Sequence, residues 1–183
     1  MPRSRRNIIA GAPYHVLNRS NGRFAIFGSD DSYRKFCRLL DLAASKYEMR
    51  IVAFCIMPNH WHMILRPNDA KQLSQCMFWL CNTHTRRYHV AHESVGQGPL
   101  YQGRYKAMLL ADDRQLWTAL RYVERNALTA KLTTSAAAWP WCSASAVGQR
   151  LVNLNFEPCQ MAADWQQSLD APMTASEFDK SAT

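Results

Sequence analysis

Residues 50–65 read RIVAFCIMPNHWHMIL, and this stretch decides the fold. Residues 50–57 are rich in β-branched and aromatic side chains, a composition that favours a strand. Pro58-Asn59 is a turn signal, and residues 60–65 form a second apolar run that ends before a Pro-Asn-Asp sequence. The stretch therefore predicts a β-hairpin.

His60 and His62 are separated by one residue on the second strand of this hairpin. Since side chains alternate along a strand, both imidazoles should point to one side of the sheet, while Trp61 and Met63 point to the other. Two neutral imidazoles side by side can hold a metal ion. Many His-x-His pairs are structural or lie on the surface, so the pair alone leaves both interpretations open.

Periodic segments surround the hairpin. Residues 14–19 alternate like a strand, residues 29–47 begin with an N-cap and carry a helical apolar stripe, and residues 70–89 carry a second stripe. Residues 102–110 read as a further strand, followed by a third helix. The order β-α-β-β-α-β-α predicts an α+β fold with a ferredoxin-like (RRM-like) antiparallel sheet, a scaffold that hosts many functions.

The third helix carries a candidate nucleophile. Asp112-Asp113 caps it, and Val123 belongs to its apolar stripe. Tyr122 and Asn126 are four residues apart, so they share one face, about 100° from the stripe. They can face a site, although a tyrosine at the edge of such a stripe is usually a packing residue.

The charge of the chain favours a polyanionic partner. The formal net charge is +8, and the pI of about 9.4 is typical of nucleic-acid-binding proteins. Residues 1–131 carry 20 Lys/Arg against 9 Asp/Glu, whereas residues 132–183 carry 2 against 5. We therefore expect a basic domain over 1–131 and an acidic C-terminal tail over 132–183 that packs on the domain or gates it.

Targeting signals are absent from the sequence. No apolar stretch follows the charged start, no run reaches membrane-spanning length, and the six cysteines contain no C-x-x-C pair. We expect a cytoplasmic protein with reduced cysteines and no membrane partner.

Several motifs together resemble a known family. Residues 57–62 (MPNHWH), residues 102–106 (QGRYK), Asp112-Asp113 and residues 120–126 (LRYVERN) are similar to motifs of the single-tyrosine HUH transposases. Within that superfamily the chain most resembles the REP-associated tyrosine transposases of bacteria, because residues 139–143 (WPWCS) match a motif that follows their catalytic helix. The resemblance covers roughly residues 1–146.

This resemblance implies that His60 and His62 are paired metal ligands, Tyr122 is the nucleophile and Asn126 is the third ligand. It further implies an enzyme, associated with the bacterial nucleoid, that nicks and rejoins single-stranded, hairpin-forming REP-like DNA through a 5′-phosphotyrosine intermediate. Such an enzyme works as a monomer or a homodimer.

Three departures from the family pattern concern loop shape and not the chemistry. Ala127 stands where members often have Pro, and Lys131 and Ser20 stand where they often have Gly.

The donor set favours Mg²⁺ or Mn²⁺. Two histidines, an amide oxygen and open positions for water and phosphate suit these ions better than a closed structural Zn²⁺ site with four protein ligands. An ordinary phenol is protonated at neutral pH, so Tyr122 would need a base, a water or the field of the metal. No P-loop motif is present, so we expect no nucleotide cofactor.

Basic side chains in several segments could border the same site and contact DNA phosphates. The candidates are Arg3, Arg5, Arg6, Arg19, Arg23, Arg86, Arg87, Arg104 and Lys106. His84, His89 and His92 are expected at the exposed end of the second helix. His15 is either a packing residue or a neighbour of the site.

Three alternatives remain. The first is a non-catalytic, single-stranded nucleic-acid-binding protein on the same scaffold, although the aromatic signature of RRM domains is absent. The second is a zinc hydrolase, but Asn59 and Trp61 flank the histidine pair where such an enzyme needs Glu. The third is a replication initiator, but the chain has no helicase motif and no second tyrosine next to Tyr122.

Overall fold

The predicted hairpin is the centre of the sheet. It is formed by β2 (Arg50–Met57) and β3 (His60–Arg66), which pair antiparallel across the Pro58-Asn59 turn. β1 (Tyr14–Arg19) pairs antiparallel with β3, and β4 (Lys106–Leu109) pairs antiparallel with β1. The strand order β2-β3-β1-β4 confirms the ferredoxin-like α+β fold.

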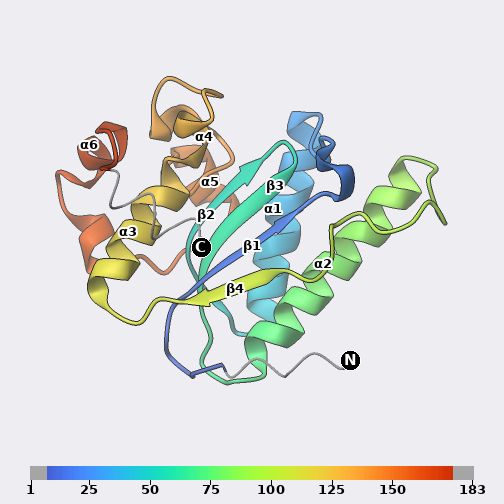
Figure 1. Cartoon of the computed structure of the whole chain (residues 1–183), viewed down its shortest axis with the longest axis horizontal. Coiled ribbons are helices and arrows are strands. Elements are labelled where there is room, and N and C mark those ends of the chain that lie inside the picture. Colours follow the sequence, from blue (N-terminus) through green and yellow to red (C-terminus); the bar gives the residue numbers. More distant parts are fainter. Residues whose placement is uncertain (1–7, 175–183) are drawn as a thin grey trace.

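In the computed structural model, which describes residues 8–174, helices lie on both faces of the sheet (Figure 1). α1 (Asp30–Lys46) and α2 (Gln72–Ala91) pack against each other on one face. α3 (Asp113–Glu124) lies over β2 and β3 on the other face. The sheet therefore separates two apolar cores.

Strand alternation assigns each side chain of β3 to a face. Trp61 and Met63 are fully buried in the core under α1 and α2, whereas Ile64 belongs to the core under α3. This confirms that His60 and His62 point to the side opposite Trp61, toward α3.

The two helix starts predicted from capping residues are confirmed. The Ser29 hydroxyl accepts a hydrogen bond from the Ser32 amide, and the Ser32 hydroxyl accepts one from the Ser29 amide, which together form a capping box at α1. The Asp112 carboxylate accepts a hydrogen bond of 2.7 Å from the Gln115 amide at the start of α3.

Two elements are shorter than predicted. The strand expected over 102–110 begins only at Lys106, because Gly103 has a φ of 148° and residues 102–105 form a loop. The third helix ends at Glu124, and a separate turn of helix, α4 (Asn126–Thr129), follows Arg125.

The segment after residue 131 contributes to both cores. It contains α5 (Ala146–Leu151) and α6 (Trp165–Asp170). Trp141 packs in the core under α1 and α2, and Trp165 packs in the core under α3. These contacts are packing contacts; the division of the chain at residue 131 stays a prediction.

This segment also covers the outer edge of β2. The Ile56 amide donates a hydrogen bond of 2.9 Å to the Trp141 carbonyl, and the Ser143 amide donates one of 2.9 Å to the Phe54 carbonyl. Cys55 and Cys142 form an isolated antiparallel bridge between these bonds.

Within residues 8–174, no helix has the length and apolar character needed to span a membrane. The cysteines whose side chains are described are free thiols, in agreement with the expected reduced state.

Candidate active site

The two histidines of β3 lie side by side on the face covered by α3. Their ring centroids are 5.2 Å apart and their planes are nearly perpendicular, at 83°. His62 is 5% exposed and His60 is half-buried at the hairpin turn. The predicted pair is thus formed at the end of the sheet where the hairpin turns.

Each histidine of the pair has its Nδ1 atom in a hydrogen bond. His60 Nδ1 lies 2.6 Å from Oδ1 of Asn59, and His62 Nδ1 lies 2.9 Å from Nε2 of His15. An amide oxygen only accepts, so His60 Nδ1 donates and its Nε2 carries the free lone pair. In the tautomer in which His62 Nδ1 donates to His15 Nε2, the Nε2 lone pair of His62 is free as well. Metal-binding histidines are typically oriented in this way, through the nitrogen that does not bind the metal.

His15 is a neighbour of the site and not only a packing residue. It is 2% exposed on β1, opposite Ile64 of β3. Its ring stacks on His62 with centroids 5.1 Å apart and meets Tyr122 edge-on at 5.8 Å. Because side chains alternate along β1, the sequence could have indicated that His15 and Tyr14 point to opposite faces of the sheet. The contact of His15 with His62 depends on the register between β1 and β3, which the sequence does not reveal.

Burial keeps the three histidines neutral. Desolvation lowers the pKa of His15 to about 4, and desolvation together with the nearby charge of Arg19 lowers the pKa of His60 to about 4. Desolvation and the neighbouring histidines hold the pKa of His62 well below its usual value. Neutral imidazoles are the form that binds a metal ion.

Tyr122 lies against the histidine pair from the last turn of α3. Its ring meets that of His62 edge-on, with centroids 5.4 Å apart and an interplanar angle of 84°. It is half-buried, because Leu120 and Val123 anchor the helix to the sheet and leave Tyr122 at the edge of the core. Tyr122 therefore both packs at the edge of the core under α3 and contacts His62.

Three other tyrosines, Tyr101, Tyr105 and Tyr88, lie elsewhere. The Tyr101 hydroxyl accepts a hydrogen bond of 3.1 Å from the Trp61 indole, on the opposite face of the sheet. Burial raises the pKa of Tyr101 well above its usual value. Tyr105 is buried on the same face, and Tyr88 stacks on His92. Tyr122 is the tyrosine that contacts the site.

Asn126 is buried at the first position of α4, which packs against β2. No three His, Cys, Asp or Glu side chains in the described part of the chain are arranged to hold a metal ion. The Asn126 amide oxygen is a donor of another type, and its role as the third ligand stays a prediction. Nitrogen and oxygen donors of this kind suit Mn²⁺ or Mg²⁺.

The predicted DNA contacts fall into three groups. Arg19 pairs with His60 across the strands and its charge acts on both histidines. Arg23 lies at the hairpin turn, where its carbonyl accepts a hydrogen bond from Asn59. Arg86, Arg87 and Arg104 are exposed away from the histidine pair, whereas the exposed Lys106 is the strand partner of Leu17, which pairs with His62, so Lys106 points to the face of the histidine pair. Arg3, Arg5 and Arg6 lie outside the described residues.

The expectation that His84 is exposed was wrong. His84 is 9% exposed, and its Nδ1 lies 2.6 Å from the Tyr101 hydroxyl. It packs between Phe27 and Phe36, so it belongs to the core. His92 is exposed, as expected.

Sequence reasoning missed Glu124, which is 1% exposed and lies two residues after Tyr122. Its carboxyl group accepts hydrogen bonds from Ser143 at 2.7 Å, Gln160 at 3.0 Å and Trp165 at 2.7 Å. Burial raises the pKa of Glu124, and these three hydrogen bonds oppose that shift. A charged residue among apolar helix positions could have indicated a buried carboxyl group, but its partners are distant in sequence.

Comparison with known proteins shows the family. Residues 9–126 match the family described as "Transposase IS200 like", a match that includes the histidine pair, Tyr122 and Asn126. No curated protein matches the chain in sequence.

Two solved structures are similar in fold. One is a REP-associated tyrosine transposase bound to a REP hairpin, with a TM-score of 0.61 and 16% identity over 78% of this chain and 82% of that chain. The other is described as a transposase from Deinococcus radiodurans, with a TM-score of 0.46 and 18% identity over 63% of this chain and 91% of that chain. With its fold, its histidine pair and the family match over most of its length, the chain belongs to the IS200-like transposase family.

Proposed function

We propose that this transposase is a metal-dependent DNA transesterase that nicks and rejoins single strands of hairpin-forming, REP-like palindromic DNA through a 5′-phosphotyrosine bond to Tyr122. The observation that carries the proposal is the contact between the Tyr122 ring and His62, with centroids 5.4 Å apart. The similar fold of a transposase that binds a REP hairpin supports the choice of DNA.

His60, His62 and Asn126 would hold the metal ion, which is Mg²⁺ or Mn²⁺. The hydrogen bonds at Nδ1 of the two histidines leave their Nε2 atoms for it. When bound, such an ion polarises the scissile phosphate and stabilises the charge that grows on its oxygens.

Tyr122 would attack the phosphorus atom through its phenolic oxygen. A bond forms between this oxygen and phosphorus, and the bond from phosphorus to the 3′ oxygen breaks. The phenol gives up its proton as this bond forms, the 3′ oxygen takes up one proton and leaves as a free 3′-OH, and the 5′ phosphate stays attached to Tyr122. The reverse reaction with another 3′-OH rejoins the strand and needs no ATP, because the phosphotyrosine conserves the bond energy.

Arg19 would contribute a fixed positive charge beside the reacting phosphate. Its strand partner is His60, and its charge reaches both histidines. A cation here would stabilise the negative phosphate in a partly buried site, where charge interactions are less screened than in water.

A non-catalytic single-stranded nucleic-acid-binding protein is the alternative. It needs the basic surface and the sheet but has no use for a tyrosine against two neutral histidines. The two functions differ in whether the protein becomes covalently attached to DNA.

A denaturing gel of a 5′- and 3′-labelled hairpin oligonucleotide with unpaired flanks, incubated with protein and Mn²⁺ or Mg²⁺, tests the proposal. We expect a protein band that carries the 3′ label, because Tyr122 holds the 5′ phosphate of the downstream fragment, and a released 5′-labelled strand that ends in 3′-OH. Tyr122→Phe should form no adduct and bind the hairpin within a few-fold of the unchanged chain. An adduct with this variant, or hairpin binding by the unchanged chain without any adduct, would contradict the proposal.

A further inference from the structure

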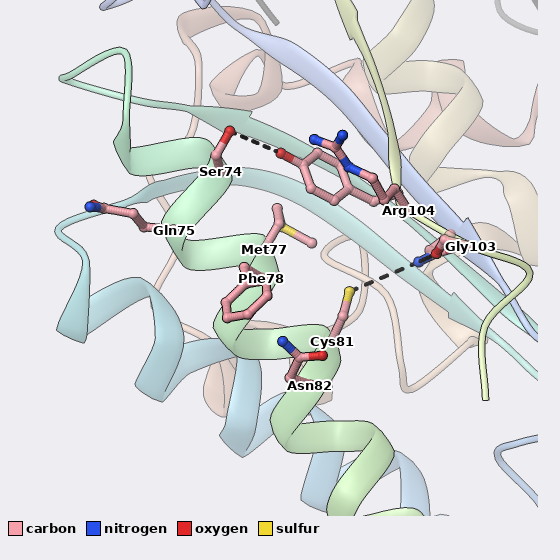
Figure 2. A pocket seen from close by; sticks show the side chains of 10 residues that line it. Ser74, Gln75, Met77, Phe78, Cys81, Asn82, Gly103 and Arg104 are labelled. Atoms are coloured by element: carbon pink, nitrogen blue, oxygen red, sulfur yellow. Dashed lines mark hydrogen bonds between the residues drawn. The ribbon is translucent and has the colours of Figure 1, made fainter. Parts of the chain in front are cut away.

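A cavity of about 560 Å³ lies between α2 and the loop that leads into β4, a size typical of small-molecule sites (Figure 2). Asn18 of β1 closes one end, where its amide donates a hydrogen bond of 3.3 Å to the Gly103 carbonyl. Across the cavity, the Tyr105 hydroxyl lies 3.4 Å from that of Ser74. Since Asn18 and His15 point to opposite sides of β1, the cavity lies on the face opposite the histidine pair.

The walls and the mouth of this cavity differ in character. Met77 and Cys81 form apolar walls, and desolvation raises the pKa of the Cys81 thiol to about 12, so it stays neutral. Phe78 at the mouth is 72% exposed, which is unusual for a large aromatic side chain. Figure 2 shows the side chain of Asn82 beside Phe78 and Cys81, whereas that of Gln75 extends away from them, and neither amide forms a hydrogen bond with another described residue.

Positive charge borders the mouth on two sides. Arg104 lines the cavity from the loop, and it is exposed. Along α2, Phe78, Asn82 and Arg86 are spaced by four residues and so form one exposed stripe. Arg86 and Arg87 line a second hollow further along the same helix. An exposed aromatic ring among cations is the combination that binds single-stranded nucleic acids.

The cavity and the histidine pair lie on opposite faces of the sheet but near the same end of β1. Asn18 lines the cavity, and the next residue, Arg19, pairs with His60. The Gln102 amide donates a hydrogen bond of 3.0 Å to the Arg19 carbonyl, which fixes the loop at this point. Lys106 is exposed on the edge strand β4. A strand that leaves the histidine pair can therefore cross the edge of the sheet past Arg104 and Lys106 and reach the cavity.

We propose that this cavity binds one unpaired base of the DNA substrate, a few nucleotides from the scissile phosphate. The inference rests on the proposed function and deepens it. The base stacks on Phe78, its edge bonds to the free amide of Asn82, and Arg104 contacts the adjoining phosphate. The cavity thereby recognises one base in the unpaired DNA beside the hairpin.

A double-mutant cycle between protein and DNA tests this inference. Hairpin binding is measured by fluorescence anisotropy with full-length Tyr122→Phe protein, so that cleavage does not interfere. The oligonucleotides carry one abasic site at each unpaired position in turn. We expect one position, or two adjacent ones, at which loss of the base weakens binding about 10-fold. Adding Phe78→Ala should weaken binding of the intact oligonucleotide by a similar factor and have no further effect on that abasic oligonucleotide.

Phe156→Ala is the matched control, because Phe156 is 39% exposed and does not line the cavity. It should leave the abasic profile unchanged. Additive effects of Phe78→Ala and the abasic site, or a flat abasic profile, would overturn the inference while an adduct formed by the unchanged chain still supports the proposed function. If the unchanged chain forms no adduct and binds no hairpin, both proposals fail.

Discussion

The indole of Trp165 donates a hydrogen bond of 2.7 Å to the carboxyl group of Glu124, and so joins α6 to the helix that carries Tyr122. The guanidinium of Arg121 adds a bond of 2.9 Å to the Ser168 carbonyl, and that of Arg125 bonds to the Ala171 carbonyl. The C-terminal segment thus contacts residues before and after Tyr122 at the end of α3.

Trp165→Phe should therefore weaken both stability and nicking. It removes the indole donor and leaves a Glu124 oxygen short of one partner in a buried position, at a cost of about 1–3 kcal/mol. We expect a lower urea midpoint and slower adduct formation with unchanged hairpin affinity. Trp117→Phe is the control, since Trp117 meets Trp165 edge-on but is 42% exposed. If the tail instead competed with DNA for the basic surface, Trp165→Phe would bind the hairpin more tightly at low salt, which packing alone does not predict.

Removal of the proposed metal ligands should reduce nicking in a graded order. His60→Ala and His62→Ala each remove an imidazole nitrogen, and Asn126→Ala removes a weaker amide oxygen, so the asparagine variant should keep the most activity. The measurement is adduct formation against Mn²⁺ concentration. Full activity of the unchanged chain in excess EDTA would show that the site needs no metal.

His15 should control metal affinity without binding the metal. His15→Phe keeps a ring beside His62 but removes the hydrogen-bond partner of its Nδ1, so we expect the Mn²⁺ concentration for half-maximal nicking to rise about 10- to 100-fold. His15→Gln offers an oxygen near the position of Nε2 and should recover part of the loss. Equal Mn²⁺ dependence of all three proteins would assign His15 a packing role only.

Each active site should be complete within one chain. His60, His62 and Tyr122 come together from β3 and α3 of the same chain, with the Tyr122 ring in contact with His62. A mixture of Tyr122→Phe and His60→Ala proteins should therefore stay inactive at any ratio. Recovery of nicking in the mixture would mean that two chains exchange their catalytic helices.

Acidification should destabilise the fold through His84. Burial lowers the pKa of His84 to about 3, whereas an unfolded histidine has a pKa near 6.5. Between these values the unfolded chain binds the extra proton, so stability is full above about pH 6.5 and falls as the pH drops toward 3. The loss from this residue reaches at most about 1.4 kcal/mol per pH unit. His84→Gln should flatten the fall of the urea midpoint between pH 6.5 and 4.5, and parallel curves would refute this assignment.

Local patterns predicted the features that depend on one segment. The alternation of His60 and Trp61 placed the pair on the correct face, and the caps at Ser29 and Asp112 located two helix starts. The spacing of Tyr122 from Val123 correctly separated the residue that faces the site from the residue that anchors the helix.

Features that depend on pairing between distant segments were not predictable. His15 contacts His62 only because β1 and β3 adopt one register, and Glu124 is satisfied by residues 19 to 41 positions later in the chain. His84 looked like a surface histidine because its partner, Tyr101, comes from a loop that folds back over α2. Tertiary contacts decide these cases, and periodicity carries no information about them.

The main-chain bonds from Ile56 to Trp141 and from Ser143 to Phe54 have a consequence for association between molecules. An open outer edge on an apolar strand such as β2 would offer unpaired amides and carbonyls to a second copy of the chain, which is a route to aggregation. Residues 141–143 occupy that edge, so continuation of the sheet through β2 is blocked. A homodimer of this transposase would have to form through another surface.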